Sequence, residues 1–373
     1  MEPRFTLFVV AAPGVEHVVA EEVEELADRP VEAVPGGVRL KGTLVDAAGL
    51  VLWCRTGGRV LVELGEVPAA SLQELRARAR ALPWSQVLHP GQPFTVKATL
   101  RDARYKRADA AAENVQRAIQ DATRGRHHRG RLPQVEVRAR VAGRTATLSV
   151  DAGGGLLHRR GYRKATAKAP LRENLAAAIL RAAGWRPGVP LVDPMCGSGT
   201  FSIEAALWAA DRAPGLERRP PIVDAPAFPG SAWGALLQEA KRSIRPVEGV
   251  FLASDRDRGA LTAARSNAER AEVAAAITFA QRAVTDPIPS PPTGPGLVVL
   301  NPPYGKRVAE NVRLAGLYHA AGRALAAQLP GWRVAALSPD RALAGRLVPG
   351  GEPLLEFSNG GIPVLLQVGE LKP

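Results

Sequence analysis

The stretch Leu191-Val-Asp-Pro-Met-Cys-Gly-Ser-Gly-Thr200 decides the fold, because it takes the chain from a short apolar strand through a glycine-rich turn into a helix. Glycines allow a tight turn and the close approach of a ligand, and the first N–H groups of the helix stay free to face that ligand. The Lys-Ser or Lys-Thr pair of a P-loop and the three-glycine spacing of a dinucleotide fold are both absent. The stretch therefore predicts a ligand site at the carboxyl end of a strand in an α/β fold.

Strands and helices are expected to alternate from residue 171 onward. The expected strands are Leu191–Pro194, Gly249–Asp255, Ala276–Ala280, Leu297–Asn301, Trp332–Ser338, Leu354–Ser358 and Pro363–Val368. The expected helices are Leu171–Ala183, Phe201–Ala210, Ala260–Ala271 and Val312–Leu329. Alternation predicts a doubly wound, mostly parallel sheet. The short link between the last two strands allows only an antiparallel hairpin.

Acidic residues follow the next two expected strands. Asp255 ends one strand, where a carboxylate can accept both hydroxyls of a ribose, and Asp286 follows the next and could accept from an adenine amine. Recognition of a nucleoside without a phosphate site indicates S-adenosylmethionine. The predicted cofactor-binding residues are Asp193, Pro194, Cys196, Gly197, Ser198, Gly199, Thr200, Asp255 and Asp286.

A second motif, Asn301-Pro302-Pro303-Tyr304, ends the apolar run Leu297–Leu300. An exocyclic amine on a nucleobase is a poor nucleophile because its lone pair is delocalised into the ring. An Asn carbonyl beside a Pro carbonyl can accept both N–H bonds, and the tyrosine offers a flat face for an extruded base. We interpret these four residues as a catalytic clamp for a base amine.

Positive charge is concentrated in one part of the chain. Residues 97–168 carry 18 basic and 6 acidic groups, which accounts for most of the formal net charge of +13. Such a field attracts a polyanion, and RNA, DNA and an anionic membrane surface are the candidates, although a charge run can also be a solvated face. The predicted RNA-binding residues are Arg101, Arg104, Lys106, Arg107, Arg124, Arg126, Arg129, Arg131, Arg159, Arg160, Arg163 and Lys164.

The composition of the chain also indicates its number of domains, its compartment and whether it crosses a membrane or binds a metal. The 373 residues are too many for one typical domain, and two cysteines argue against a disulfide framework, as in a reducing cytoplasm. No run approaches the roughly 20 apolar residues of a membrane span, and the first residues lack the order of a signal peptide. His127-His128 lack spaced partners for a metal. We expect a cytoplasmic monomer without a metal site.

Taken together, the motifs resemble those of a known class of enzymes. Asp193–Thr200, the turn Ser254–Asp257 and Asn301–Tyr304 look like motifs I, II and IV of class I methyltransferases that act on exocyclic amines. With His158-Arg-Arg-Gly-Tyr-Arg163 and Leu7-Phe-Val-Val-Ala-Ala-Pro-Gly-Val-Glu16, the chain resembles the THUMP-containing RNA guanine-N2 methyltransferases, which include the tRNA guanine-6 and 23S rRNA guanine-2445 enzymes.

The resemblance covers essentially the whole chain and implies its organisation. It implies a ferredoxin-like α+β domain at 1–65, an RNA-binding THUMP domain at 66–155, a basic linker at 156–170 and a seven-stranded Rossmann-like methyltransferase domain at 171–373. Motif I has Met195 where an aromatic residue is common, and the chain ends without the second methyltransferase domain of the fused rRNA enzymes. The tRNA or rRNA substrate and the modified position stay open.

The sequence alone leaves three possible functions. The first is N2 methylation of guanosine in structured RNA. The second is N6 methylation of adenine in RNA or DNA, because the clamp recognises an amine and not the ring that bears it. The third is a non-catalytic RNA-binding or assembly factor, against which the intact glycines, acids and clamp argue.

Overall fold

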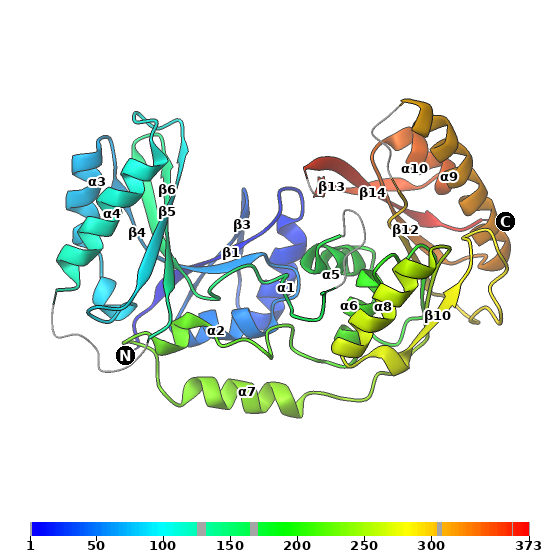
Figure 1. Cartoon of the computed structure of the whole chain (residues 1–373), viewed down its shortest axis with the longest axis horizontal. Helices are drawn as coiled ribbons and strands as arrows, with labels where there is room; N and C mark the ends of the chain where they lie inside the picture. Colours follow the sequence, from blue (N-terminus) through cyan, green and yellow to red (C-terminus); the bar gives the residue numbers. More distant parts are fainter. Residues whose placement is uncertain (1, 125–131, 165–170, 304–307, 360, 373) are drawn as a thin grey trace. The chain divides into compact units, whose positions relative to one another are not determined.

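A computed structural model describes residues 2–124, 132–164, 171–303, 308–359 and 361–372 (Figure 1). The chain forms two compact units. The N-terminal unit comprises Met1–Ala11, Ala20–Leu157 and Gly215–Glu239, and the C-terminal unit comprises Ala12–Val19, His158–Pro214 and Ala240–Pro373. Each unit therefore includes a segment that is remote in sequence from the rest of it.

The N-terminal unit is built on one mixed sheet in the order β2-β3-β1-β4-β7-β6-β5. Its strands are β1 (Phe5–Val10), β2 (Glu32–Val34), β3 (Gly37–Gly42), β4 (Arg59–Pro68), β5 (Phe94–Arg101), β6 (Val135–Ala142) and β7 (Thr145–Asp151). β4 pairs antiparallel with β1 on one side and with β7 on the other. The boundary expected between residues 65 and 66 falls inside β4, so the two small folds share a continuous sheet at that point.

Helices and 3-10 turns accompany this sheet. They are α1 (Glu16–Ala27), which begins among residues of the C-terminal unit, α2 (Leu44–Trp53), α3 (Leu72–Arg80), η1 (Trp84–Gln86), α4 (Ala108–Ala122), η2 (Pro221–Asp224) and α7 (Ala232–Arg242), whose residues from Ala240 onward belong to the C-terminal unit. We expected the proline-rich stretch Pro214–Pro229 to be an irregular surface loop. Instead Gly215 donates to the Leu52 carbonyl at 2.8 Å, and Ile222 and Phe228 are buried in this unit.

The C-terminal unit has a seven-stranded sheet in the order β10-β9-β8-β11-β12-β14-β13. Its strands are β8 (Leu191–Asp193), β9 (Phe251–Asp255), β10 (Ile277–Gln281), β11 (Leu297–Leu300), β12 (Arg333–Ser338), β13 (Glu352–Asn359) and β14 (Ile362–Glu370). The first five strands in this order run parallel, and β14 is antiparallel to both β12 and β13. The doubly wound Rossmann-like sheet with a terminal hairpin is thereby confirmed.

Helices alternate with the strands of this sheet along the chain. They are α5 (Glu173–Ala182), α6 (Thr200–Ala209), α8 (Arg258–Arg270), α9 (Val308–Gln328) and α10 (Arg341–Leu347), with the turn η3 (Ala274–Ala276) before β10. The strand order reverses between β8 and β11, since the chain moves from β8 to β9 on one side and later adds β11 on the other. Ligands of open α/β sheets bind at such a switch point, outside the carboxyl ends of the strands. The two predicted motifs follow these two neighbouring strands.

Candidate active site

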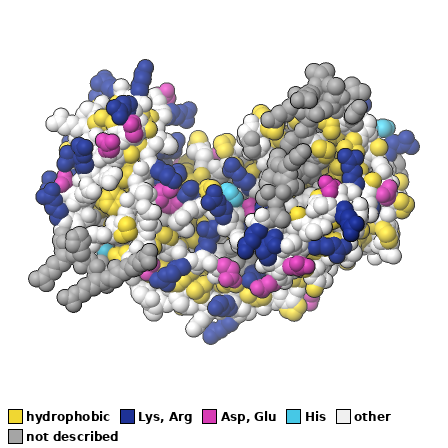
Figure 2. All heavy atoms as spheres, viewed as in Figure 1, with side chains coloured by type: hydrophobic (Ala, Val, Ile, Leu, Met, Phe, Trp, Pro, Cys, Tyr) yellow, Lys and Arg dark blue, Asp and Glu magenta, His cyan; other side chains and the backbone are white. Residues whose placement is uncertain are grey.

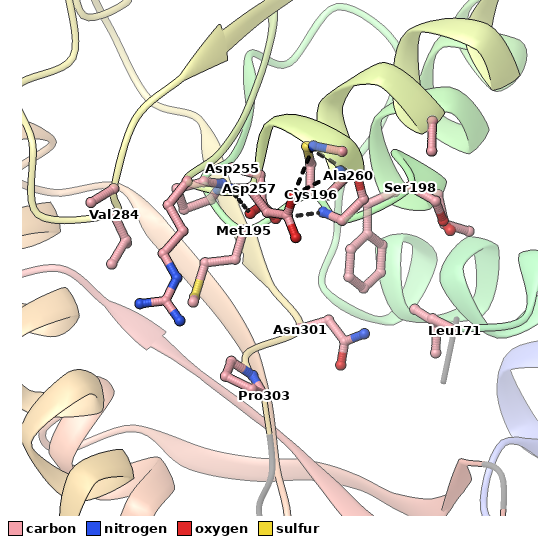
Figure 3. A pocket seen from close by; sticks show the side chains of 18 of the residues that line it. Leu171, Met195, Cys196, Ser198, Asp255, Asp257, Ala260, Val284, Asn301 and Pro303 are labelled. Carbon is pink, nitrogen blue, oxygen red and sulfur yellow. Dashed lines mark hydrogen bonds between the residues drawn. The ribbon is translucent and has the colours of Figure 1, made fainter. Parts of the chain in front are cut away.

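A cavity of about 730 Å³ opens at this switch point. Figure 3 shows Asp255 and Cys196 on one side of the open space, with Asn301 and Pro303 on the other. The lining residues come from the loops after β8, β9, β10 and β11 and from the starts of α6 and α8, together with Leu171 before α5 and Leu317 of α9. The structure thus brings the predicted cofactor motif and the predicted clamp into one cavity.

The loop after β8 owes its shape to two glycines with different tasks. Gly197 has φ +53°, and a Cβ placed on it would meet nothing within 4 Å, so its backbone lies open to a ligand. Gly199, with φ +82°, precedes the first residue of α6, and a Cβ there would lie 3.1 Å from the Ala264 side chain of α8. Pro194, Cys196, Gly197, Ser198 and Thr200, which belong to the predicted cofactor-binding set, line the cavity. Gly199 serves helix packing instead.

Asp255 joins this loop to the end of β9. Its carboxylate accepts from the Gly197 N–H at 2.9 Å through one oxygen and from the Asp257 N–H at 2.9 Å through the other. Both oxygens are thereby fixed in orientation, and the side chain lines the cavity. A carboxylate has about four lone-pair sites, so Asp255 retains acceptor capacity for the two hydroxyls of a ribose.

Asp193 differs from its predicted role. It is 1% exposed and accepts from the Ser202 hydroxyl at 3.2 Å inside the unit. Among the residues that the structure describes, Asp193 is not part of the cavity wall. Burial, with the nearby charge of Asp255, raises its pKa to about 8. Asp193 therefore lies outside the cavity wall and is hydrogen-bonded to Ser202 of α6.

This raised pKa predicts a pH-dependent stability. The folded protein keeps a proton on Asp193 that the unfolded chain, with a pKa near 3.8, releases. The free energy of unfolding therefore falls as pH rises from about 4 to about 8, by at most about 1.4 kcal/mol per pH unit for this proton. Urea titrations of the wild type and Asp193→Asn at pH 5, 6 and 7 should show a flatter decline for the variant. Equal slopes would contradict the assignment.

Asp286 also departs from its predicted role. Its carboxylate accepts from the backbone N–H of Ala283 at 2.8 Å and so stabilises the turn after β10. The described cavity wall contains Ala283, Val284 and Thr285 from this turn but not Asp286. Asp286 therefore shapes the cavity wall through the hydrogen bond of its carboxylate to the Ala283 backbone.

The clamp motif follows β11 directly. Asn301 is half-buried and lines the cavity, and Figure 3 shows its amide directed into the open space, on the side where Leu171 lies. Pro302 is buried, whereas Pro303 is exposed and lines the cavity. Tyr304, the predicted stacking residue, lies outside the described residues.

Two of the twelve predicted RNA-binding residues are buried in ion pairs. The side chain of Arg160 is 3% exposed and lies 3.1 Å from the Glu204 carboxylate, and that of Arg163 is 9% exposed and lies 3.1 Å from Glu173. A buried guanidinium that is held by a carboxylate cannot meet a phosphate in solution, so the predicted RNA contact of both arginines is wrong. Sequence reasoning missed both acidic partners, of which Glu204 lies far along the chain from Arg160 and Glu173 begins the next helix after Arg163.

The other predicted RNA-binding residues divide into two groups. Those that the structure places on the surface are Arg101, Arg104, Lys106, Arg107, Arg124, Arg159 and Lys164. Arg126, Arg129 and Arg131 lie outside the described residues. Figure 2 shows Lys and Arg side chains spread over the exposed face of the part built from α3, α4, β5 and β6. Arg101, Arg107 and Arg124 each lie within 4 Å of an aspartate.

Among the residues that the structure describes, no group of three or more His, Cys, Asp or Glu side chains is placed to hold a metal ion.

None of the helices in the described part of the chain has the length and apolar character needed to cross a membrane.

Three family models match consecutive parts of the chain. The ferredoxin-like domain model of RlmL matches residues 6–61, the THUMP domain model matches 69–151, and the model of the RMKL-like methyltransferase domain matches 160–348. The last match alone spans just over half of the chain. The three matches agree with the expected order of domains.

Several solved structures are similar over the whole chain. SMU.472, a methyltransferase solved in complex with SAH, is 27% identical with a TM-score of 0.89, covering 99% of each chain. A predicted N6-adenine-specific DNA methylase from Listeria monocytogenes is 28% identical with a TM-score of 0.87, covering 98% of this chain and 96% of that one. TrmN from Thermus thermophilus is 25% identical with a TM-score of 0.72, covering 98% and 99%.

Proposed function

Because the chain belongs to the RMKL-like methyltransferase family, we propose that it transfers the methyl group of S-adenosyl-L-methionine to the exocyclic N2 amine of a guanosine in structured RNA. The chain is an S-adenosylmethionine-dependent methyltransferase with a THUMP domain, and its substrate is a nucleic acid. The guanine ring, the N2 position and RNA as the substrate are the finer part of the proposal.

One observation carries the proposal. Asn301 and Pro303 line the same cavity as Asp255 and the loop Cys196–Thr200, so a base amine held by the clamp would face a cofactor held by the loop. Placing two reactants in line within one site supplies a large part of the catalysis of a transfer between them. Neither a metal ion nor a covalent enzyme intermediate is needed for such a step.

The chemistry follows from the groups in the cavity. Asn301 and the Pro302 carbonyl would accept the two N–H bonds of the amine and favour a pyramidal nitrogen. The nitrogen lone pair forms the new N–C bond to the methyl carbon while the C–S bond breaks and its electrons return to sulfur. The products are S-adenosylhomocysteine and an N-protonated amine, which loses its proton to water.

Adenine N6 is the second candidate, and a specific observation favours it. The name of the similar Listeria monocytogenes protein specifies N6 of adenine in DNA. Against it stand the THUMP match at 69–151 and the ferredoxin-like match to RlmL, which favour a structured RNA. The clamp itself accepts either amine.

The deciding experiment uses the purified full chain. It is incubated with S-adenosylmethionine and, separately, with unmodified tRNA, rRNA and duplex DNA, and the digested nucleosides are identified by mass spectrometry. We expect N2-methylguanosine from one of the RNA pools. N6-methyladenosine from any pool would replace guanine in the proposal, and S-adenosylhomocysteine binding without any product would move the proposal toward a non-catalytic RNA factor.

The basic stretch 124–131, of which the structure describes only the exposed Arg124, is proposed to bind the RNA backbone. Replacing Arg124, Arg126, Arg129 and Arg131 together by glutamine should weaken RNA binding about equally for all sequences. It should also reduce the slope of log K against log salt by about three, if each arginine neutralises one phosphate. Fluorescence anisotropy between 50 and 200 mM salt measures both quantities.

A matched control changes the same number of exposed basic residues in the C-terminal unit. These residues are Lys241, Arg242, Arg333 and Arg341. An unchanged slope in the first variant, or the same loss in both, would show that the cluster is an ordinary solvated surface.

A further inference from the structure

Arg163 joins three separate parts of the C-terminal unit. Its Nη2 donates to the Thr200 hydroxyl at 2.8 Å and to the Leu171 carbonyl at 2.7 Å, and its Nε lies 3.1 Å from the Glu173 carboxylate. Thr200 begins α6, and Leu171 precedes α5. Thr200 and Leu171 both line the cavity, whereas Arg163 is not part of the described lining. One buried guanidinium therefore holds two parts of the cavity wall at a fixed separation.

A second route links the same segment to the cofactor loop. The Tyr162 carbonyl accepts from Arg270 Nε at 2.7 Å, Arg270 donates to the Asn267 side chain, and Asn267 donates to the Ser198 carbonyl at 3.1 Å. The Tyr162 hydroxyl donates to Glu204 at 2.8 Å. Burial raises the pKa of Tyr162 well above 10, so the hydroxyl stays a neutral donor. Residues 160–163 are thus connected by hydrogen bonds to the loop Cys196–Thr200 and to α6.

The position of the Arg163 guanidinium is energetically unfavourable for a positive charge. The N-terminus of α6 carries the positive end of the helix dipole, and a cation there lowers the stability of the helix. A buried charge also loses its hydration, and it is tolerated when a carboxylate such as Glu173 pairs with it. The same burial raises the pKa of Glu173, against the attraction of Arg163. Arg163 is buried here despite both costs, and the hydrogen bonds that it makes go to Thr200 and the Leu171 carbonyl, two residues of the cavity wall.

We infer that Arg163 is a positioning residue for S-adenosylmethionine, which fixes Thr200 and the Leu171 carbonyl in the cavity wall and leaves RNA binding to other residues. The inference rests on the proposed use of this cavity for the cofactor and is independent of the base that is methylated. The Arg163 fork is required because a lysine ammonium cannot reach Glu173, Thr200 and the Leu171 carbonyl with the same geometry.

The test compares cofactor and RNA affinities in full-length variants. Arg163→Met should raise the Kd for S-adenosylhomocysteine and the KM for S-adenosylmethionine about tenfold and leave the Kd for RNA unchanged. Arg163→Lys should restore part of the loss. Thr200→Val, which keeps the shape and removes the hydroxyl acceptor, should give a smaller loss, and the double variant Arg163→Met/Thr200→Val should bind no more weakly than Arg163→Met alone.

Two controls separate the possible failures. Arg172→Met removes an exposed arginine beside Glu173 and should leave both affinities unchanged. Asp255→Ala, measured in parallel, tests the cavity itself: if it does not weaken the cofactor, the cavity assignment is wrong. If it does and folded Arg163→Met or Thr200→Val retains the wild-type Kd, the positioning role is wrong. A loss of RNA affinity alone in Arg163→Met would also overturn the inference.

Discussion

Asn301→Ala is expected to lower kcat roughly 100- to 1,000-fold while the Kd for S-adenosylhomocysteine stays within about twofold of the wild type. Loss of one preorganised hydrogen-bonding group in the transition state has effects of this size. Asn301 directly follows β11 and lies across the cavity from Asp255, so in the proposed complex its amide would meet the base amine while Asp255 would meet the ribose. Single-turnover methylation at saturating cofactor and RNA measures the chemical step, and calorimetry measures cofactor affinity.

Two further variants give this experiment its controls. Asn301→Asp keeps an oxygen acceptor at the same place and should retain more activity than Asn301→Ala. Asn114→Ala removes an asparagine side chain that bonds within α4 of the N-terminal unit, and it should leave turnover unchanged. Wild-type turnover in Asn301→Ala would show that the clamp assignment is wrong. Weaker cofactor binding as the main effect would assign Asn301 to the cofactor instead.

Local patterns explain why the catalytic half was predictable. The strand β8, its turn and α6 follow one another within twenty residues, and each step leaves a mark in the sequence: a short apolar run, glycines at positive φ, then an apolar helix. The terminal hairpin was likewise predicted from a four-residue link, and β13 and β14 pair antiparallel. Features that depend on neighbouring residues can be recognised from one sequence.

Features that depend on distant partners could not be recognised. Arg160 and Arg163 were interpreted as part of a basic surface because their neighbours in sequence are basic. Their burial depends on Glu204 and Glu173, which only the packing of α6 and α5 brings to them. Charge alone does not indicate whether an arginine faces solvent.

Three features of the N-terminal unit were also not predicted from the sequence. Helix α2 has six buried residues and little amphipathic character, so its apolar run gave no helical period, although the capping box of Thr43 and Asp46 was a local signal. The continuity of the sheet through β4 arises from pairing with β1 and β7, and β7 lies about eighty residues further along the chain. The segment Gly215–Glu239 joins this unit for a similarly non-local reason.

We propose two roles for Asp255, ordering of the loop and binding of the cofactor ribose. Its carboxylate accepts from the Gly197 and Asp257 N–H groups, and the side chain lines the cavity. Hydrogen bonds to a charged acceptor contribute about 1.5–3 kcal/mol each. Loss of two such bonds to a ribose therefore predicts a Kd for S-adenosylhomocysteine at least about 100-fold higher in Asp255→Ala.

The ribose contact can be isolated with an altered ligand. The wild type should bind S-adenosylhomocysteine more tightly than its 2′-deoxy analogue, and Asp255→Ala should bind the two alike, because the acceptor for the 2′-hydroxyl is gone. Asp257→Ala serves as the control, since it removes the cap of α8 but leaves the Asp255 carboxylate in place, so the preference for the hydroxyl should persist. If Asp255→Ala lost overall affinity but kept the full preference, its carboxylate would act only on the loop, and the ribose would have to be held by another group.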